Sequence, residues 1–137
     1  MTIHFGTDGW RGVIGDTFTF HNLRMVSQAI ADAVASEDWV PRGQPSGDPR
    51  RMVVGFDTRF LSDRFAVEAA RVLAGNSFKV SLTSADVPTP TASFAVRQLG
   101  AVAGIMITAS HNAPRYNGVK LKASYGGSAA REQCKQV

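Results

Sequence analysis

The sequence has few of the features that mark secreted or membrane proteins. Its 137 residues include one cysteine, Cys134, so no disulfide can form within the chain. No apolar run approaches the roughly 20 residues that a membrane-spanning helix needs. Residues 1–6 lack the basic and apolar stretches of a secretory signal peptide. We therefore expect a soluble, cytoplasmic protein that does not act at a membrane.

Motifs for metal centres and nucleotide-binding loops are absent as well. The sequence has no C-x-x-C or H-E-x-x-H pattern, and its three histidines, His4, His21 and His111, are far apart. It has no G-x-x-x-x-G-K-[ST] loop, and the glycines near its start do not have the G-x-G-x-x-G spacing. These patterns therefore give no support for a zinc site, a P-loop or a dinucleotide site.

The positive charge is modest and spread along the chain. The formal net charge is +4, and the arginines fall in different parts of the sequence and not in one cluster. A nucleic-acid surface requires Lys and Arg residues clustered on one face with aromatic residues between them, so we expect no nucleic-acid partner. A small anionic ligand fits this charge better, and a solvated basic surface without function is the alternative.

Hydrophobic periodicity predicts one α/β domain. Hydrophobic residues make up 44% of the chain and charged residues 19%, as in globular proteins. Helices are predicted at 20–36 with Thr19 as N-cap, from Ser62 as N-cap to Gly75 as C′ residue, and at 89–99 with proline in first position. Strands are predicted at 51–56, 78–82, 102–107 and 117–123, with a surface loop at 37–50. This order predicts a three-layer α/β/α sandwich with a mixed, mostly parallel sheet.

Two predicted loops follow strands of this sheet, where α/β folds bind their ligands. They are Asp57-Thr58-Arg59 and the segment TASHNAP at 108–114. An ordinary polar turn is one interpretation of the second loop. A serine hydrolase would need a base from elsewhere in the fold and usually a G-x-S-x-G elbow, which is absent. Ser110 as a phosphoryl carrier fits better.

A phosphoserine requires cations and hydrogen-bond donors around it. Lys120 follows Ser110 by ten residues on the predicted returning strand, and His111 and Asn112 could donate to a phosphate or to sugar hydroxyls. For Lys120 the alternative is an exposed lysine at a strand end. The opening FGTDGWRG could present Arg11 to an anion on a closely packed backbone, or could form only tight turns.

Together, FGTDGWRG, GFDTR, PTPT and TASHNAPRYNGVK resemble motifs of the first domain of the α-D-phosphohexomutases, the phosphoglucomutase and phosphomannomutase superfamily. They occur in family order from Phe5 to about Lys122. The resemblance implies that residues 1–137 form the phosphoserine-bearing α/β/α domain I of a four-domain enzyme. Residues 131–137 would begin the link to the second domain, whose D-G-D-x-D-R metal loop is absent from this sequence.

The resemblance also implies a mechanism. Ser110 would pass a phosphoryl group to a hexose phosphate and recover the other phosphate of the resulting hexose 1,6-bisphosphate. The expected cofactor, Mg²⁺, would bind this chain only through the phosphate on Ser110. The predicted catalytic residues are Ser110, His111, Lys120 and Arg11, and the predicted substrate contacts are Thr7, Asn112 and Arg59.

One departure from the family lies in the loop itself. The usual H-N-P is H-N-A-P here, with Pro114 one place later, so we expect a small change in loop stiffness and intact chemistry. Glucose phosphate ranks first as substrate, before mannose and glucosamine phosphates. The alternative function is a non-catalytic module that binds an anion or a protein partner. The chain alone should be inactive, and apolar surface meant for the other domains should favour self-association.

Overall fold

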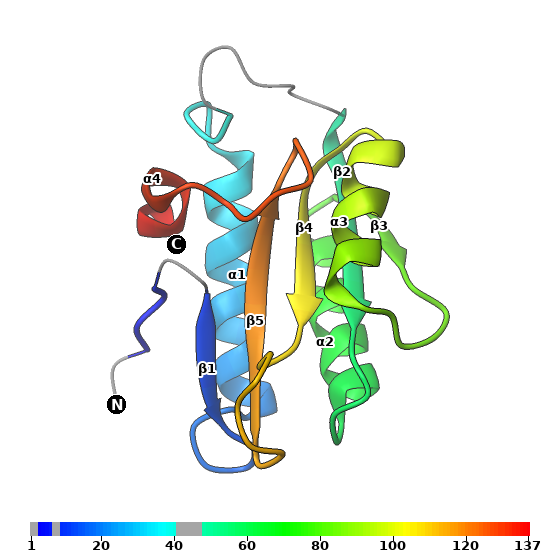
Figure 1. Ribbon diagram of the computed structural model, residues 1–137. Coiled ribbons are helices and arrows are strands. Elements are labelled where there is room, and N and C mark those ends of the chain that lie inside the picture. The colour runs from blue at the N-terminus through cyan, green and yellow to red at the C-terminus, as the bar shows by residue number, and fades with distance from the viewer. Residues whose placement is uncertain (1–2, 7–8, 41–47) are drawn as a thin grey trace.

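A computed structural model describes residues 3–6, 9–40 and 48–137. Along these residues the strands and helices are, in chain order, β1 (Trp10–Val13), α1 (Phe20–Ala35), β2 (Asp48–Phe56), α2 (Ser62–Gly75), β3 (Lys79–Leu82), α3 (Thr89–Gln98), β4 (Ala101–Ile107), β5 (Tyr116–Ala123) and α4 (Arg131–Gln136). Figure 1 shows one sheet with helices on both of its faces. In the described part of the chain, no helix is both long enough and apolar enough to cross a membrane.

The strands form a single mixed sheet in the order β1-β5-β4-β2-β3. β2 pairs in parallel with β3 and β4, whereas β5 is antiparallel to both β4 and β1. The predicted mixed sheet with parallel central strands is therefore confirmed. The glycine-rich opening, for which no strand was predicted, contains the edge strand β1, in which Trp10 lies opposite Val119.

The two faces of the sheet are covered unequally. Helices α1 and α2 pack side by side on one face, and α3 covers the other over β2 and β4 (Figure 1). The main core on the α1–α2 side includes Phe18, Leu23, Phe65 and Val54. The neighbouring Val53 belongs instead to a small cluster under α3. This alternation confirms the three-layer α/β/α sandwich.

Local capping follows the prediction at α1 and departs from it at α2. Thr19 caps α1, since its Oγ1 accepts a hydrogen bond of 3.1 Å from the Asn22 amide. At α2 the N-cap is Leu61, with a left-handed φ of 65°, and Ser62 is the first helical residue. The Ser62 hydroxyl donates to Asp57 Oδ1 at 2.8 Å, so it is engaged across the loop and not in a cap.

Several further details of the element ends differ from the prediction. Gly75 is the last residue of α2, and Asn76 is its C-cap, with Nδ2 donating to the Val72 carbonyl at 2.8 Å. Helix α3 begins at Thr89, one residue before its proline. Strand β2 begins at Asp48, because the Asp48 amide donates to the Gly100 carbonyl at 2.6 Å. The remainder of the predicted surface loop at 37–50 includes residues 41–47, which lie outside the described residues.

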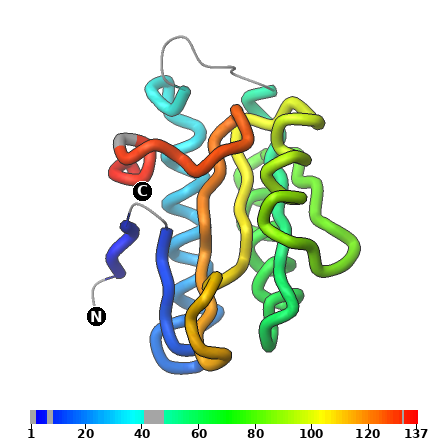
Figure 2. The backbone as a smooth tube through the Cα atoms, in the orientation of Figure 1, coloured from blue at the N-terminus to red at the C-terminus, as the bar shows by residue number. Residues whose placement is uncertain are grey.

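The topology gathers several connections at one end of the sheet. Because β2 and β4 are parallel, the segments after Phe56 and Ile107 leave the sheet at the same end. The segment after β1 turns there as well (Figure 2). This end carries most of the side chains that the sequence predicts to be functional.

Candidate active site

Ser110 lies in a tight turn between β4 and β5. Its amide donates to Thr108 Oγ1 at 3.1 Å, and the Asn112 amide donates to the Ala109 carbonyl at 3.0 Å. The backbone φ of Ser110 is 53°, a left-handed value that residues other than glycine rarely adopt. Ser110 is half-buried and His111 is exposed. The turn thus holds a partly accessible hydroxyl at the end of a fully buried strand.

Lys120 and Arg11 lie on one face of the sheet near this turn. Lys120 is opposite Met106 in the β4–β5 pair, and Arg11 is opposite Gly118 in the β1–β5 pair. Gly118 and Lys120 are two residues apart on β5 and therefore share a face. A Cβ added to Gly118 would lie 2.9 Å from Arg11 Cγ, which places Arg11 across that glycine.

Arg11 also contacts the Ser110 turn directly. Its Nη1 donates to Asn112 Oδ1 at 2.8 Å in an exposed position. The structure therefore brings together Arg11, Ser110, His111 and Asn112, with Lys120 on the adjoining strand. The predicted contact Thr7 lies outside the described residues.

Arg59 takes a different place from its neighbours. Its side chain is 12% exposed, and it extends from the loop after β2 to the inner side of the Ser110 turn. Nη2 donates to the carbonyls of Ser110 (2.8 Å) and Asn112 (2.7 Å), and Nη1 donates to those of Ala113 (2.9 Å) and Tyr116 (3.0 Å). The structure thus shows Arg59 supporting the turn, and its contact with a substrate stays a prediction.

A series of buried hydrogen bonds connects Arg59 to β5. The sequence analysis did not predict it. Asn117 Nδ2 donates to Ser62 Oγ at 2.9 Å, and Ser62 donates to Asp57, whose Oδ1 also accepts from the Arg59 amide at 3.0 Å. Ser62 and Asn117 are fully buried. Asp57 and Asn117 stand inside the motifs GFDTR and NGVK, so the motifs themselves were the available signal.

Two glycines of the same motifs allow the strands to approach closely. Gly9 has a φ of 101°, and a Cβ there would lie 1.9 Å from the Val119 carbonyl oxygen. A Cβ on Gly118 would lie 2.6 Å from the Trp10 oxygen and 2.9 Å from the Thr108 oxygen. The opening therefore packs closely against β5, and its presentation of Arg11 to an anion stays a prediction.

The residues present do not form a complete metal site. Within residues 3–6, 9–40 and 48–137 there is no group of three or more His, Cys, Asp or Glu side chains that could hold an ion. At the turn itself, the ligand for Mg²⁺ that the sequence predicts is an oxygen of a phosphoryl group on Ser110. The magnesium ligand on Ser110 therefore stays a prediction.

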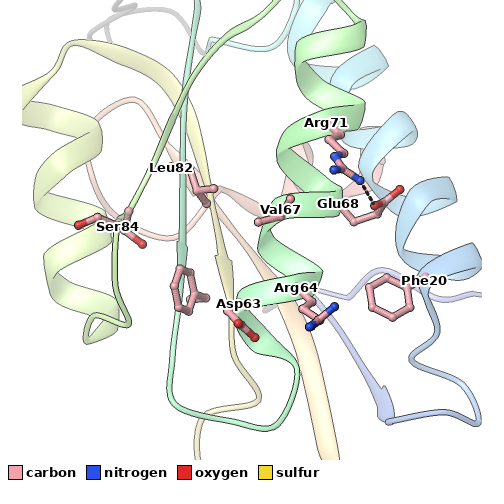
Figure 3. A pocket seen from close by; sticks show the side chains of 10 residues that line it. Phe20, Asp63, Arg64, Val67, Glu68, Arg71, Leu82 and Ser84 are labelled. Atoms are coloured by element: carbon pink, nitrogen blue, oxygen red, sulfur yellow. Dashed lines mark ion pairs between the residues drawn. The ribbon is translucent and has the colours of Figure 1, made fainter.

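A groove lies apart from the Ser110 turn. It measures about 640 Å³ and is formed by α2 with the ends of α1 and β3 (Figure 3). Glu68 at its rim accepts a hydrogen bond of 2.8 Å from Arg24 Nε, and Arg71 lies 3.5 Å away. The Arg24 hydrogen bond and the charges of both guanidinium groups lower the pKa of Glu68. No nucleophile is paired with a base here.

Comparison with known proteins decides the family. The sequence profile described as phosphoglucomutase/phosphomannomutase, alpha/beta/alpha domain I, matches residues 2–137. The chain belongs to the phosphoglucomutase/phosphomannomutase family. The family resemblance predicted from FGTDGWRG and TASHNAPRYNGVK is therefore confirmed.

Individual relatives of this phosphoglucomutase/phosphomannomutase domain carry different sugar names. A phosphoglucomutase of Staphylococcus saprophyticus is 47% identical and matches 98% of this chain. The probable phosphoribomutase of Schizosaccharomyces pombe is 40% identical over 87% of it. The crystal structure of a Thermus thermophilus protein assigned as a phosphomannomutase covers 99% of the chain with 46% identity and a TM-score of 0.87.

The chain spans only part of these relatives. It matches 23% of the staphylococcal protein, 20% of the Schizosaccharomyces protein and 29% of the Thermus chain. The family domain I fold is therefore shown for this chain, whereas what a complete protein does is a separate question.

Proposed function

We propose that this chain is the phosphoserine domain of a phosphohexomutase that interconverts hexose 1-phosphate and hexose 6-phosphate. Residues 131–137, which contain the short helix α4, would begin the link to a second domain. The observation that carries the proposal is the position of Ser110: its turn is contacted by Arg11, and Lys120 is on the adjoining strand. A half-buried hydroxyl on a turn with these cationic residues on the neighbouring strands suits a covalently held phosphoryl group.

The chemistry assigned to these side chains is phosphoryl transfer in two directions. A sugar hydroxyl oxygen attacks the phosphorus on Ser110, the bond from phosphorus to the serine oxygen breaks, and the hydroxyl proton passes to Lys120. In the return step the Ser110 oxygen attacks the other phosphorus of the bisphosphate, the bond from that phosphorus to the sugar oxygen breaks, and the sugar oxygen takes the proton back from Lys120. Such transfer depends on positioning and on neutralising charge spread over the phosphoryl oxygens, which Arg11 and His111 would assist.

Mg²⁺ is part of the proposal as a cofactor of a complete enzyme. A hard cation prefers oxygen ligands, and phosphoryl oxygens are among its usual ligands. The metal would supply additional neutralisation of the phosphoryl charge. Its remaining ligands would come from residues outside this chain.

Glucose is the proposed sugar. The support is the 47% identity to a staphylococcal phosphoglucomutase, together with the residues of the motifs FGTDGWRG and GFDTR. The names of the Thermus and Schizosaccharomyces relatives make mannose and ribose phosphates the necessary comparison substrates.

The test is conversion of glucose 1-phosphate to glucose 6-phosphate, with glucose 1,6-bisphosphate as activator. We expect activity in a polypeptide that carries the remaining domains, none in residues 1–137 alone, and a loss of about 100-fold or more in Lys120→Met, as for removal of a general base. Absence of turnover with every sugar phosphate in the longer polypeptide would favour the non-catalytic anion- or protein-binding module.

A further inference from the structure

The hydrogen-bonding capacity of Arg59 is already occupied. The two terminal nitrogens of a guanidinium carry four N–H groups, and in Arg59 they donate to four backbone carbonyls of the segment 110–116. The remaining donor, Nε, lies 3.3 Å from Asp57 Oδ2. A sugar or phosphate could bind Arg59 only by displacing the turn that carries Ser110.

The guanidinium is itself fixed in orientation. Asp57 accepts from the Arg59 backbone amide and from the Ser62 hydroxyl, and Ser62 in turn accepts from Asn117 on β5. Since Ser62 and Asn117 are fully buried, this chain of hydrogen bonds anchors Arg59 to α2 and to the sheet.

The inward carbonyls have a consequence for the outer side of the turn. In a trans peptide the C=O and the following N–H point in opposite directions. The Ser110 and Asn112 carbonyls face Arg59, so the amides of His111 and Ala113 are directed away from it. Neither amide has an acceptor among the described residues. Outward amides beside a phosphorylated serine are suitable donors to its oxygens.

We infer that Arg59 is a positioning residue for phosphoryl transfer: it holds the turn 108–116 so that the Ser110 hydroxyl and the His111 and Ala113 amides face the transferring group. This inference rests on the proposed function. It also predicts that lysine cannot replace Arg59, because an ammonium group has three donors and no planar fork.

Activity measurements on the polypeptide with all its domains separate positioning from substrate binding. We expect Arg59→Lys to lower kcat by about 10- to 100-fold, as for small misplacements of reacting groups, with KM for the sugar phosphate within about twofold of the unmodified enzyme. Arg71→Lys, at a 74% exposed site on α2, is the matched control and should change neither constant. A normal kcat in Arg59→Lys, or a raised KM with unchanged kcat, would overturn the inference.

Amide hydrogen exchange in the 137-residue chain gives a second readout that does not need turnover. The Asn112 and Tyr116 amides bond to carbonyls within the turn. They should exchange faster in Arg59→Lys, while amides of α1 keep their rates and Arg71→Lys behaves as the unmodified chain. Unchanged exchange at both amides would overturn the inference. If the unmodified enzyme never phosphorylates Ser110, the proposed function fails, and the exchange result alone decides whether Arg59 holds the turn.

Discussion

At the scale of single residues, Ser110 combines a reactive side chain with an unfavourable backbone. A left-handed conformation costs an ordinary L-residue about 1–2 kcal/mol, and the φ of Ser110 is 53°. The hydrogen bond from Arg59 to the Ser110 carbonyl and the one from the Ser110 amide to Thr108 Oγ1 offset this cost. Strain kept at one serine in a turn is consistent with a demand on where that hydroxyl lies.

This strain can be measured by comparing two substitutions at the same site. Ser110→Gly should have a free energy of unfolding about 1 kcal/mol higher than Ser110→Ala, because glycine adopts positive φ without steric cost. The exposed Ser77, with a φ of 68°, is the control outside the site and should show the same difference. Urea unfolding checks both pairs. Equal stabilities of the two Ser110 variants would show that the site carries no strain.

The positions of some motif residues in the fold could be predicted from the sequence, and those of others could not. Ser110, His111 and Asn112 are contiguous and follow an apolar strand, so their position at the sheet edge could be predicted. Arg59 could be placed in a loop but not under the turn, since its partners are more than 50 residues away. Long-range hydrogen bonds of this kind leave no local pattern.

At the scale of elements, the approach of β1, β4 and β5 depends on Gly118. A Cβ there would lie within 3 Å of backbone oxygens in two neighbouring segments. Gly118→Ala should lower the free energy of unfolding by about 1–3 kcal/mol, the usual cost of overpacking. Gly75→Ala, which meets nothing within 4 Å, should be neutral or stabilising. Thermal or urea unfolding of the two variants gives the comparison, and equal effects would contradict this packing account.

The ion pair between α1 and α2 adds a pH-dependent contribution. The folded-state pKa of Glu68 is lowered from its usual 4.5, first by the Arg24 hydrogen bond. Its contribution is therefore fully present above about pH 4.5 and is lost as the pH falls through the lowered pKa. Glu68→Gln should cost up to about 1 kcal/mol at pH 7, the range for partly exposed pairs.

The control is to compare the unfolding free energies of the unmodified chain and Glu68→Gln again at acidic pH. Once Glu68 is protonated in the folded protein, the difference in unfolding free energy between the unmodified chain and Glu68→Gln should shrink. A difference that stays constant or grows as the pH is lowered would mean that the Arg24–Glu68 pair does not stabilise the contact between the helices.

Elements with strong periodicity were predictable and short ones were not. Helix α1 and the fully buried β4 were predicted within a residue or two, because apolar spacing reports burial directly. Strand β1 has only four residues, WRGV, and its pairing partner β5 lies about a hundred residues later. The prediction of Ser62 as the N-cap of α2 was wrong, because the Ser62 hydroxyl donates a hydrogen bond to Asp57 across the loop.

At the scale of the whole molecule, the chain exposes large apolar side chains. Phe60 is 70% exposed, Phe94 is 65% exposed and Met25 is 53% exposed. These surfaces suit the proposal that further domains pack against this one. Sedimentation of residues 1–137 should therefore show association that increases with protein concentration and weakens in Phe60→Ser/Phe94→Ser. A strictly monomeric chain at high concentration would contradict this expectation.

The central claim is that Ser110 carries the phosphoryl group covalently. Its most direct test is the intact mass of the complete enzyme before and after incubation with glucose 1,6-bisphosphate, followed by mapping of the modified peptide. The account predicts a gain of one phosphoryl group that maps to Ser110 and is absent in Ser110→Ala. Mutase turnover that persists at its normal rate in Ser110→Ala, without modification of that peptide, would contradict it.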